Sequence, residues 1–124
     1  MKLFVDSANL AEIEESLARG FVAGITTNPS ILAKEERTDF TEHIHKIIGL
    51  IRRYGREVPL SVEVFVDDPA EMLDQALKFV SAFRYPMLSV TVPPQFFPAL
   101  TQHPKTTEAV DQFLGDFRKW SEQA

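Results

Sequence analysis

The chain has 124 residues, the length of one ordinary domain. Its 13 basic and 18 acidic side chains give a net charge of −5, which argues against a protein that binds nucleic acid or an anionic membrane through a basic face. Hydrophobic residues make up 44% of the chain, enough for a core, and no apolar run approaches the roughly 18 residues of a membrane-spanning helix. Cysteine is absent and the first residues lack the apolar region of a secretory signal, so we expect a cytoplasmic protein.

The first half of the chain predicts two strands that alternate with helices. The run Leu3–Asp6 is typical of a strand, and Asn9 followed by Glu12 three residues later is a capping box that predicts a helix. Gly20 is a natural end for that helix. The pattern then predicts a strand at 22–27, a short helical piece around 31–32, and a helix over about 39–53 with apolar residues at spacings of three, four and seven.

The second half repeats this alternation. Strands are predicted at 60–65 and 87–92, and the helix between them has a strong start signal, with Asp68 as its N-cap and Pro69 at its first position. A short turn of helix through Leu100 and an amphipathic helix over 107–120 are predicted after the last strand. No linker or repeat divides residues 1–124, so we expect a single domain with parallel strands joined by right-handed crossovers.

Side-chain parity along the predicted strands is the most informative feature of the sequence. One parity is apolar, and the other places polar groups on every strand, mostly near its C-terminal end. The apolar set is Leu3, Val5, Ile25, Val62, Val64, Leu88, Val90 and Val92, and the other set is Phe4, Asp6, Thr26, Asn28, Ser61, Glu63, Ser89 and Thr91. Polar groups under helices would be costly, whereas a (β/α) barrel collects them in its mouth, so the pattern favours a barrel over a flavodoxin-like sheet.

Four sequence runs carry a resemblance to a known family. They are KLFVDSAN at 2–9, GITTNPS at 24–30, LSVEV at 60–64 and VTVPP at 90–94, the last followed by His103 and Pro104. Together they resemble the transaldolase family, in the branch that contains fructose-6-phosphate aldolase and the short microbial transaldolases. The resemblance implies part of a (β/α)8 barrel, because a complete barrel needs at least about 200 residues. Members of the family form rings.

The resemblance is incomplete in the middle of the barrel. Residues 1–85 resemble the first three β/α units, and residues 87–124 resemble the eighth unit with the C-terminal helix. This implies four parallel strands in the barrel order eight, one, two, three. The family's Schiff-base lysine lies on its fourth strand, and if Ser89–Pro93 is aligned with that strand instead, Thr91 stands at the lysine position. Neither alignment leaves a lysine there.

The resemblance also assigns roles to residues that remain. Asp6 matches an acid–base residue, Asn28 an amide that binds substrate hydroxyls, Thr26 a pocket-lining position, and Glu63 a position that points into the barrel. Plainer interpretations are that Asp6 caps a loop and that Asn28 forms a turn with the following proline. His43 and His45 are two residues apart on a helix, which makes a poor metal pair and indicates surface histidines. We expect no metal and no cofactor.

Three functional hypotheses follow. The first is a transaldolase-like protein of carbohydrate metabolism that has lost Schiff-base chemistry and binds a sugar or sugar phosphate. The second is an active aldolase or transaldolase with a composite or noncanonical lysine. The third is a non-enzymatic assembly partner or deletion fragment. Because half a barrel exposes two strand edges, we expect a homodimer or higher oligomer, in which the third strand of one copy pairs with the last strand of another. The alternative is a monomer with an open four-stranded sheet.

Overall fold

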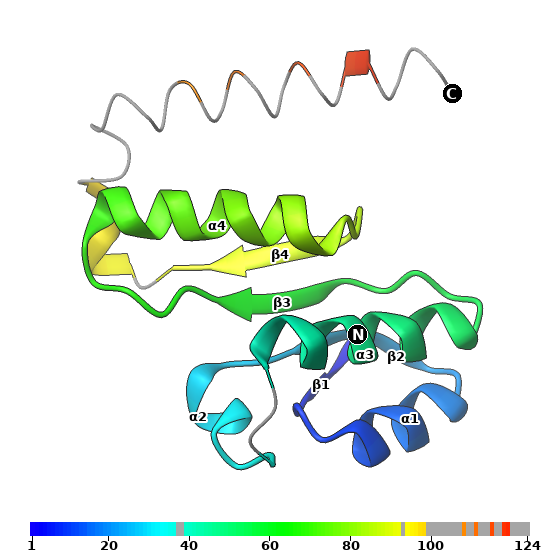
Figure 1. Cartoon of the computed structure of the whole chain (residues 1–124). Coiled ribbons are helices and arrows are strands. Elements are labelled where there is room, and N and C mark those ends of the chain that lie inside the picture. Colours follow the sequence, from blue (N-terminus) through cyan, green and yellow to red (C-terminus); the bar gives the residue numbers. More distant parts are fainter. Residues whose placement is uncertain are drawn as a thin grey trace.

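A computed structural model of the chain describes residues 1–36, 39–92 and 94–98, together with residues 108, 111, 115, 118 and 119. It is an α/β fold with one sheet of four parallel strands (Figure 1). The strands are β1 (Leu3–Asp6), β2 (Val22–Thr26), β3 (Leu60–Glu63) and β4 (Leu88–Thr91). Four parallel strands were predicted and are confirmed. The predicted turn through Leu100 and helix over 107–120 lie largely outside the described residues.

Local signals position the helices as predicted. The helices are α1 (Leu10–Ala18), α2 (Pro29–Leu32), α3 (Phe40–Arg53), α4 (Pro69–Phe83) and a 3-10 turn η1 (Pro94–Phe96). Each α-helix has an Asn or Asp at its N-cap, whose side-chain oxygen accepts a hydrogen bond from the backbone N–H three residues later. Arg84 ends α4 in the left-handed conformation with φ 47°, which is unusual for a residue other than glycine.

The strand order corrects one prediction. The order is β1-β2-β3-β4, so the last strand lies beside the third strand and the predicted order eight, one, two, three is wrong. Leu60 pairs with Leu88 and Glu63 pairs with Thr91 along this contact. The physical reason is the connection, since one helix between two parallel strands brings the chain back to the adjacent position. β4 is therefore the fourth strand in the order of the sheet.

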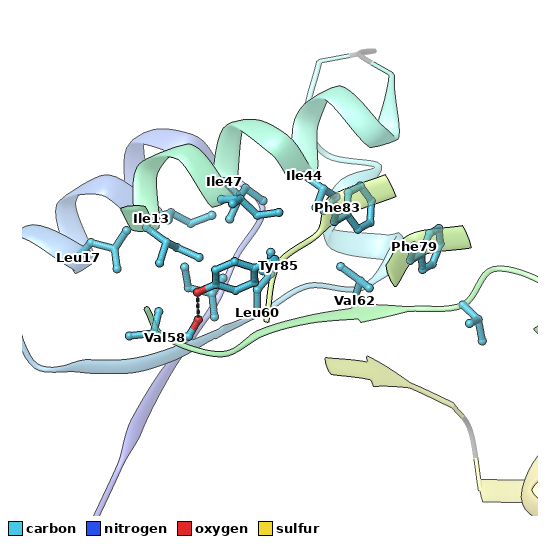
Figure 2. Close-up of a cluster of buried hydrophobic side chains, with 14 of the residues drawn as sticks. Ile13, Leu17, Ile44, Ile47, Val58, Leu60, Val62, Phe79, Phe83 and Tyr85 are labelled. Carbon is cyan, nitrogen blue, oxygen red and sulfur yellow. Dashed lines mark hydrogen bonds between the residues drawn. The ribbon is translucent and has the colours of Figure 1, made fainter. Parts of the chain in front are cut away.

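All three long helices cover one face of the sheet. Side chains from α1, α3 and α4 form a single apolar cluster with the strands (Figure 2). Ile13, Ile44, Ile47, Leu60 and Val62 are each 0% exposed in this cluster. A sequential strand order with right-handed crossovers places every helix on the same side, as in a (β/α) barrel. The arrangement agrees with the apolar parity of the sequence.

Tyr85 anchors the end of the covered face. Its hydroxyl donates a hydrogen bond to the backbone carbonyl of Val58, just before β3 (Figure 2). The ring is 5% exposed, and the guanidinium of Arg52 lies 5.8 Å from its centroid. Burial raises the pKa of the Tyr85 hydroxyl, the charge of Glu57 raises it further, and Arg52 opposes the rise. The buried phenol therefore stays protonated at neutral pH and ties α4 to the start of β3.

The opposite face of the sheet is open in the described structure. Phe4 lies on it with 52% of its surface exposed. The ring rests against Gly24, where an added Cβ would come within 1.9 Å of the ring atom Cε1. Glycine is thus required at residue 24 for the Phe4 ring to lie across β2. Toward the C-terminal ends of the strands this face becomes polar.

Candidate functional site on the open face

A row of polar side chains crosses the open face from one edge to the other. The strand register pairs Asp6 with Thr26, Thr26 with Ser61, and Ser61 with Ser89. Side chains in one row of a parallel sheet point to the same face. We call these four residues the polar row. It carries one carboxylate and three hydroxyl groups, and a second level with Glu63 and Thr91 lies two residues closer to the strand ends.

Asp6 and Thr26 are in direct contact within the polar row. The Thr26 hydroxyl donates a hydrogen bond of 2.9 Å to Oδ1 of Asp6. Asp6 is exposed and Thr26 is half-buried, so the carboxylate remains accessible from the open face. A carboxylate accepts several hydrogen bonds, and the donor from Thr26 fixes its orientation. The pair can therefore accept hydroxyl donors from a ligand.

Glu63 and Thr91 lie at the next level of the open face. Glu63 is half-buried on β3, and Thr91 is exposed on β4 opposite it. The hydroxyl of Thr91 donates to the backbone carbonyl of Val62 over 3.3 Å. If β4 is aligned with the family's fourth strand, Thr91 is the residue at the Schiff-base position. A hydroxyl there can form hydrogen bonds, but it cannot form an imine.

Asn28 follows β2 and caps the N-terminus of α2. Its Oδ1 accepts a hydrogen bond of 2.9 Å from the backbone N–H of Ile31 and caps α2. The plainer interpretation of this residue, an Asn that shapes the turn before Pro29, is thus observed. The neighbouring Thr27 hydroxyl donates to the carbonyl of Ser61 over 2.8 Å and holds the turn against β3.

A hydrogen-bond network after β1 was not found by sequence reasoning. The Ser7 hydroxyl donates to Glu12 over 2.6 Å and accepts from the backbone N–H of Asn9 over 3.0 Å. Nε2 of His43 lies 2.6 Å from the carbonyl oxygen of Ala8. His43 is 6% exposed, so its prediction as a surface residue is wrong. The missed signal is its position four residues before Ile47, on the buried stripe of α3.

The described lysines lie outside the four strands. Lys46 is on α3, with its ammonium 3.1 Å from Glu42, Lys78 is on α4, and Lys34 follows α2. Lys2 precedes β1 and shares the parity of Asp6, but four residues of extended chain separate the two by about 13 Å. Lys105 lies outside the described residues. No lysine belongs to the sheet in the part of the chain that the structure describes.

Metal-binding and membrane-spanning features are missing from the described residues. Among them, no group of three or more His, Cys, Asp or Glu side chains could hold a metal ion. In the same part of the chain, no helix has both the length and the apolar character needed to cross a bilayer.

Comparison with known proteins identifies the family. The model of the transaldolase/fructose-6-phosphate aldolase family matches residues 3–88. A probable transaldolase of Dehalococcoides mccartyi is 42% identical over 76 residues, which cover 61% of this chain and 33% of the relative. Probable transaldolases of Alkaliphilus metalliredigens (41% identical) and Listeria monocytogenes (39%) match over 93 residues, 75% of this chain and 40% of each relative.

These matches extend across most of the sheet. A stretch of 93 residues in a chain of 124 necessarily includes β3, α4 and β4. The chain nevertheless spans only a third to two fifths of the length of these relatives. With its parallel strands, one-sided helices and sequence match, the chain belongs to the transaldolase/fructose-6-phosphate aldolase family and carries part of its β/α architecture.

Proposed function

We propose that this chain is a transaldolase-family scaffold that binds polyhydroxylated ligands on the open face without forming a Schiff base. The observation that supports the proposal is the pairing of β4 with β3, because Thr91 stands at the position of the family's lysine when β4 is aligned with the family's fourth strand. The polar row below it supplies hydrogen-bonding groups but no amine. Binding and covalent chemistry are therefore separated in this chain.

The chemistry of the first covalent step supports the loss of aldolase activity. A Schiff base forms when a neutral amine attacks a carbonyl carbon, and a lysine does this at neutral pH only where burial or a nearby cation lowers its pKa. Lys46 is paired with Glu42 on the helix surface. Lys2 is exposed at the opposite end of β1 from Asp6. Neither lysine has the setting that the reaction needs.

The charges of the open face favour an uncharged polyol over a sugar phosphate. Asp6 and Glu63 are both carboxylates, and no Lys or Arg lies within the strands that the structure describes. A phosphate placed on this face would face two negative groups without a compensating cation. Neutral hydroxyl groups, by contrast, can donate to the carboxylates of Asp6 and Glu63 and can exchange hydrogen bonds with Thr26.

Trapping with borohydride tests the absence of Schiff-base chemistry. The chain is incubated with dihydroxyacetone or fructose 6-phosphate, reduced with borohydride, and weighed by intact-protein mass spectrometry. We expect no adduct on the natural sequence. A stable adduct on any lysine would overturn the proposal and favour an active enzyme with a noncanonical lysine.

A designed lysine tests the position assigned to Thr91. In Thr91→Lys the new amine lies above the polar row. At about pH 9, where an exposed lysine is partly neutral, we expect more trapping with dihydroxyacetone than in a surface control, because the polar row holds the ligand beside the amine. The matched control is Ser81→Lys, which places the same amine on the exposed surface of α4. Equal trapping in both variants would contradict the assignment of Thr91 to the family's lysine position.

Ligand binding is tested separately by NMR. Titration with an uncharged polyol should shift the amide signals of Asp6, Thr26 and Ser61, and the shifts should weaken in Asp6→Asn. Signals of the covered face, such as those of Leu60 and Val62, should move little. Shifts confined to the helices would contradict binding on the open face.

A further inference from the structure

The sheet has two edges that lack a neighbouring strand. In the described structure β1 pairs only with β2, and β4 pairs only with β3. The carbonyls of Met87, just before β4, and of Thr91, its last residue, accept from the N–H groups of Leu60 and Val64 over 3.0 and 3.4 Å. Backbone groups alternate between the two sides of a strand, so the N–H and carbonyl of Val90 point to the outer edge. Such an edge is a template for another parallel strand.

The apolar packing is also unfinished at both edges. The register row Val5–Ile25–Leu60–Leu88 lies under the helices. Its central members, Ile25 and Leu60, are 1% and 0% exposed, whereas Val5 and Leu88 at the ends are only half-buried. Leu3, also on the β1 edge, is 46% exposed. Each edge therefore offers apolar surface of the kind that the middle of the sheet buries.

We propose that a second copy of this chain completes the sheet, with β1 of each copy paired to β4 of the other. A two-fold axis parallel to the strands keeps all strands parallel and joins both pairs of edges at once. Four strands from each copy give eight, the number at which a parallel barrel closes and its interior is filled by side chains. The sequence-based expectation that β3 would pair with the partner's last strand is replaced, because β3 already lies between β2 and β4.

A second copy fits the two free edges better than another partner does, because the edges β1 and β4 complement each other. Both belong to one sheet and have the same strand direction, so each can serve as the complement of the other. Pairing of like edges, β1 with β1, would be antiparallel and would leave both β4 edges bare. Closure through two copies instead covers every edge and turns the open face, including Phe4, into the interior of a barrel.

Closure makes the polar row a composite site. The row ends with Asp6 on the β1 edge and Ser89 on the β4 edge. Across the new contact, β4 with its Ser89 adjoins the strand that carries the partner's Asp6. The polar side chains then surround one shared interior. This inference goes beyond the proposed ligand binding and does not depend on it, because the strand edges and the apolar rows carry it.

Mass in solution is the first test. Light scattering at micromolar concentration should give twice the chain mass of 14.1 kDa. Val90→Pro removes an outward-facing N–H while leaving the bonds to β3 in place, and it should convert the dimer to a monomer with an unchanged circular dichroism spectrum. Val90→Thr, which keeps the N–H and the branched shape, should remain dimeric. A natural sequence that is monomeric, or a folded Val90→Pro variant that is still dimeric, would overturn the proposal.

Cross-linking is the second test and does not rely on a disruptive variant. The chain contains no cysteine, so single cysteines report on one contact each. Val5→Cys and Leu88→Cys lie in one register row on opposite edges. A bismaleimide about 13 Å long should link the two variants when they are mixed, because it spans the four-residue register difference that a shear of eight gives to each of the two equivalent contacts. Linkage within Val5→Cys alone, or no linkage in the mixture, would overturn the arrangement.

Discussion

The two faces of the sheet differ in what they contribute to the molecule. Along β3, Leu60 and Val62 are 0% exposed beneath the helices, while Ser61 and Glu63, one residue further along in each case, remain half-buried on the open face. The same four-residue strand thus carries both a core and a polar surface. Alternate residues of β3 therefore have different tasks: Leu60 and Val62 stabilise the core, and Ser61 and Glu63 supply polar groups to the open face.

This separation lets the open face change at small cost. Burial of a leucine side chain stabilises the fold by about 1.5–3 kcal/mol, whereas substitutions on a surface usually alter stability by less than about 0.5 kcal/mol. Because Thr91 is exposed on the open face, its identity has little effect on the packing of the core. The covered face can therefore keep the family fold while the open face gains or loses reactive groups.

The largest effect is expected from neighbouring substitutions on β3. Leu60→Ala should lower the free energy of unfolding by about 3 kcal/mol, because it leaves a cavity in the covered face. Ser61→Ala, its matched control on the open face, should lower it by less than about 1 kcal/mol. Urea denaturation at one protein concentration measures both. Similar losses in the two variants would contradict the division between the faces.

Tyr85 makes the stability of the covered face depend on pH. Tyr85→Phe removes the donor to the Val58 carbonyl and should cost about 1–2 kcal/mol at pH 7. Because burial raises the pKa of Tyr85 in the folded state, the native chain holds a proton that the unfolded chain releases above about pH 10. Stability is therefore fully present below that pH and falls as pH rises through the native pKa.

The alkaline decline separates Tyr85 from the other tyrosine. The pKa of Tyr54 is also raised, by burial first and then by its hydrogen bond to Glu14. Tyr85→Phe should flatten the loss of stability between pH 9 and 11 (about one unit either side of the ordinary tyrosine value), and Tyr54→Phe should leave the part due to Tyr85. Chemical denaturation across this range measures the slope. An unchanged slope in Tyr85→Phe would mean that the buried phenol is not the group responsible.

Variants of Asn28 separate its role as the cap of α2 from a role in binding a ligand. Asn28→Ala removes the cap of α2 and should cost about 1 kcal/mol, while Asn28→Asp keeps a capping oxygen and should cost little. If the amide also donates to a ligand, both variants should weaken polyol binding. Binding that is retained in Asn28→Asp would limit this residue to its capping role.

Local features of this fold could be predicted because local interactions determine them. The caps at Asn9 and Asp68 are visible in the sequence as side chains placed before apolar stripes, and both make the expected hydrogen bonds. Strand parity alone separates Val62 from Glu63, since alternation follows from the extended backbone. The apolar face was thus predictable residue by residue.

The order of the strands could not be predicted in the same way. The pattern of β4, with Leu88 and Val90 on one face, fits any position in a parallel sheet, so its motif suggested an eighth strand. Its place beside β3 depends on the length of the crossover through α4 and on pairing along the whole strand. The hydrogen-bond partner of His43, the distant Ala8 carbonyl, depends likewise on tertiary contact, although the position of His43 on the apolar stripe of α3 could have indicated its burial. Both features arise from long-range packing.

The smallest effect is expected at the Asp6–Thr26 pair, and it is the most direct check on the open face. Thr26→Val keeps the size and branching of the side chain but removes the 2.9 Å hydrogen bond to Asp6. Because Asp6 is exposed, water can replace the lost donor, and the free energy of unfolding should change by less than about 0.5 kcal/mol. The NMR signals of Asp6 should nevertheless shift, since its carboxylate is no longer held in place. A loss above about 1.5 kcal/mol would show that the polar row supports the fold as well as the site, and the two faces would then not be independent.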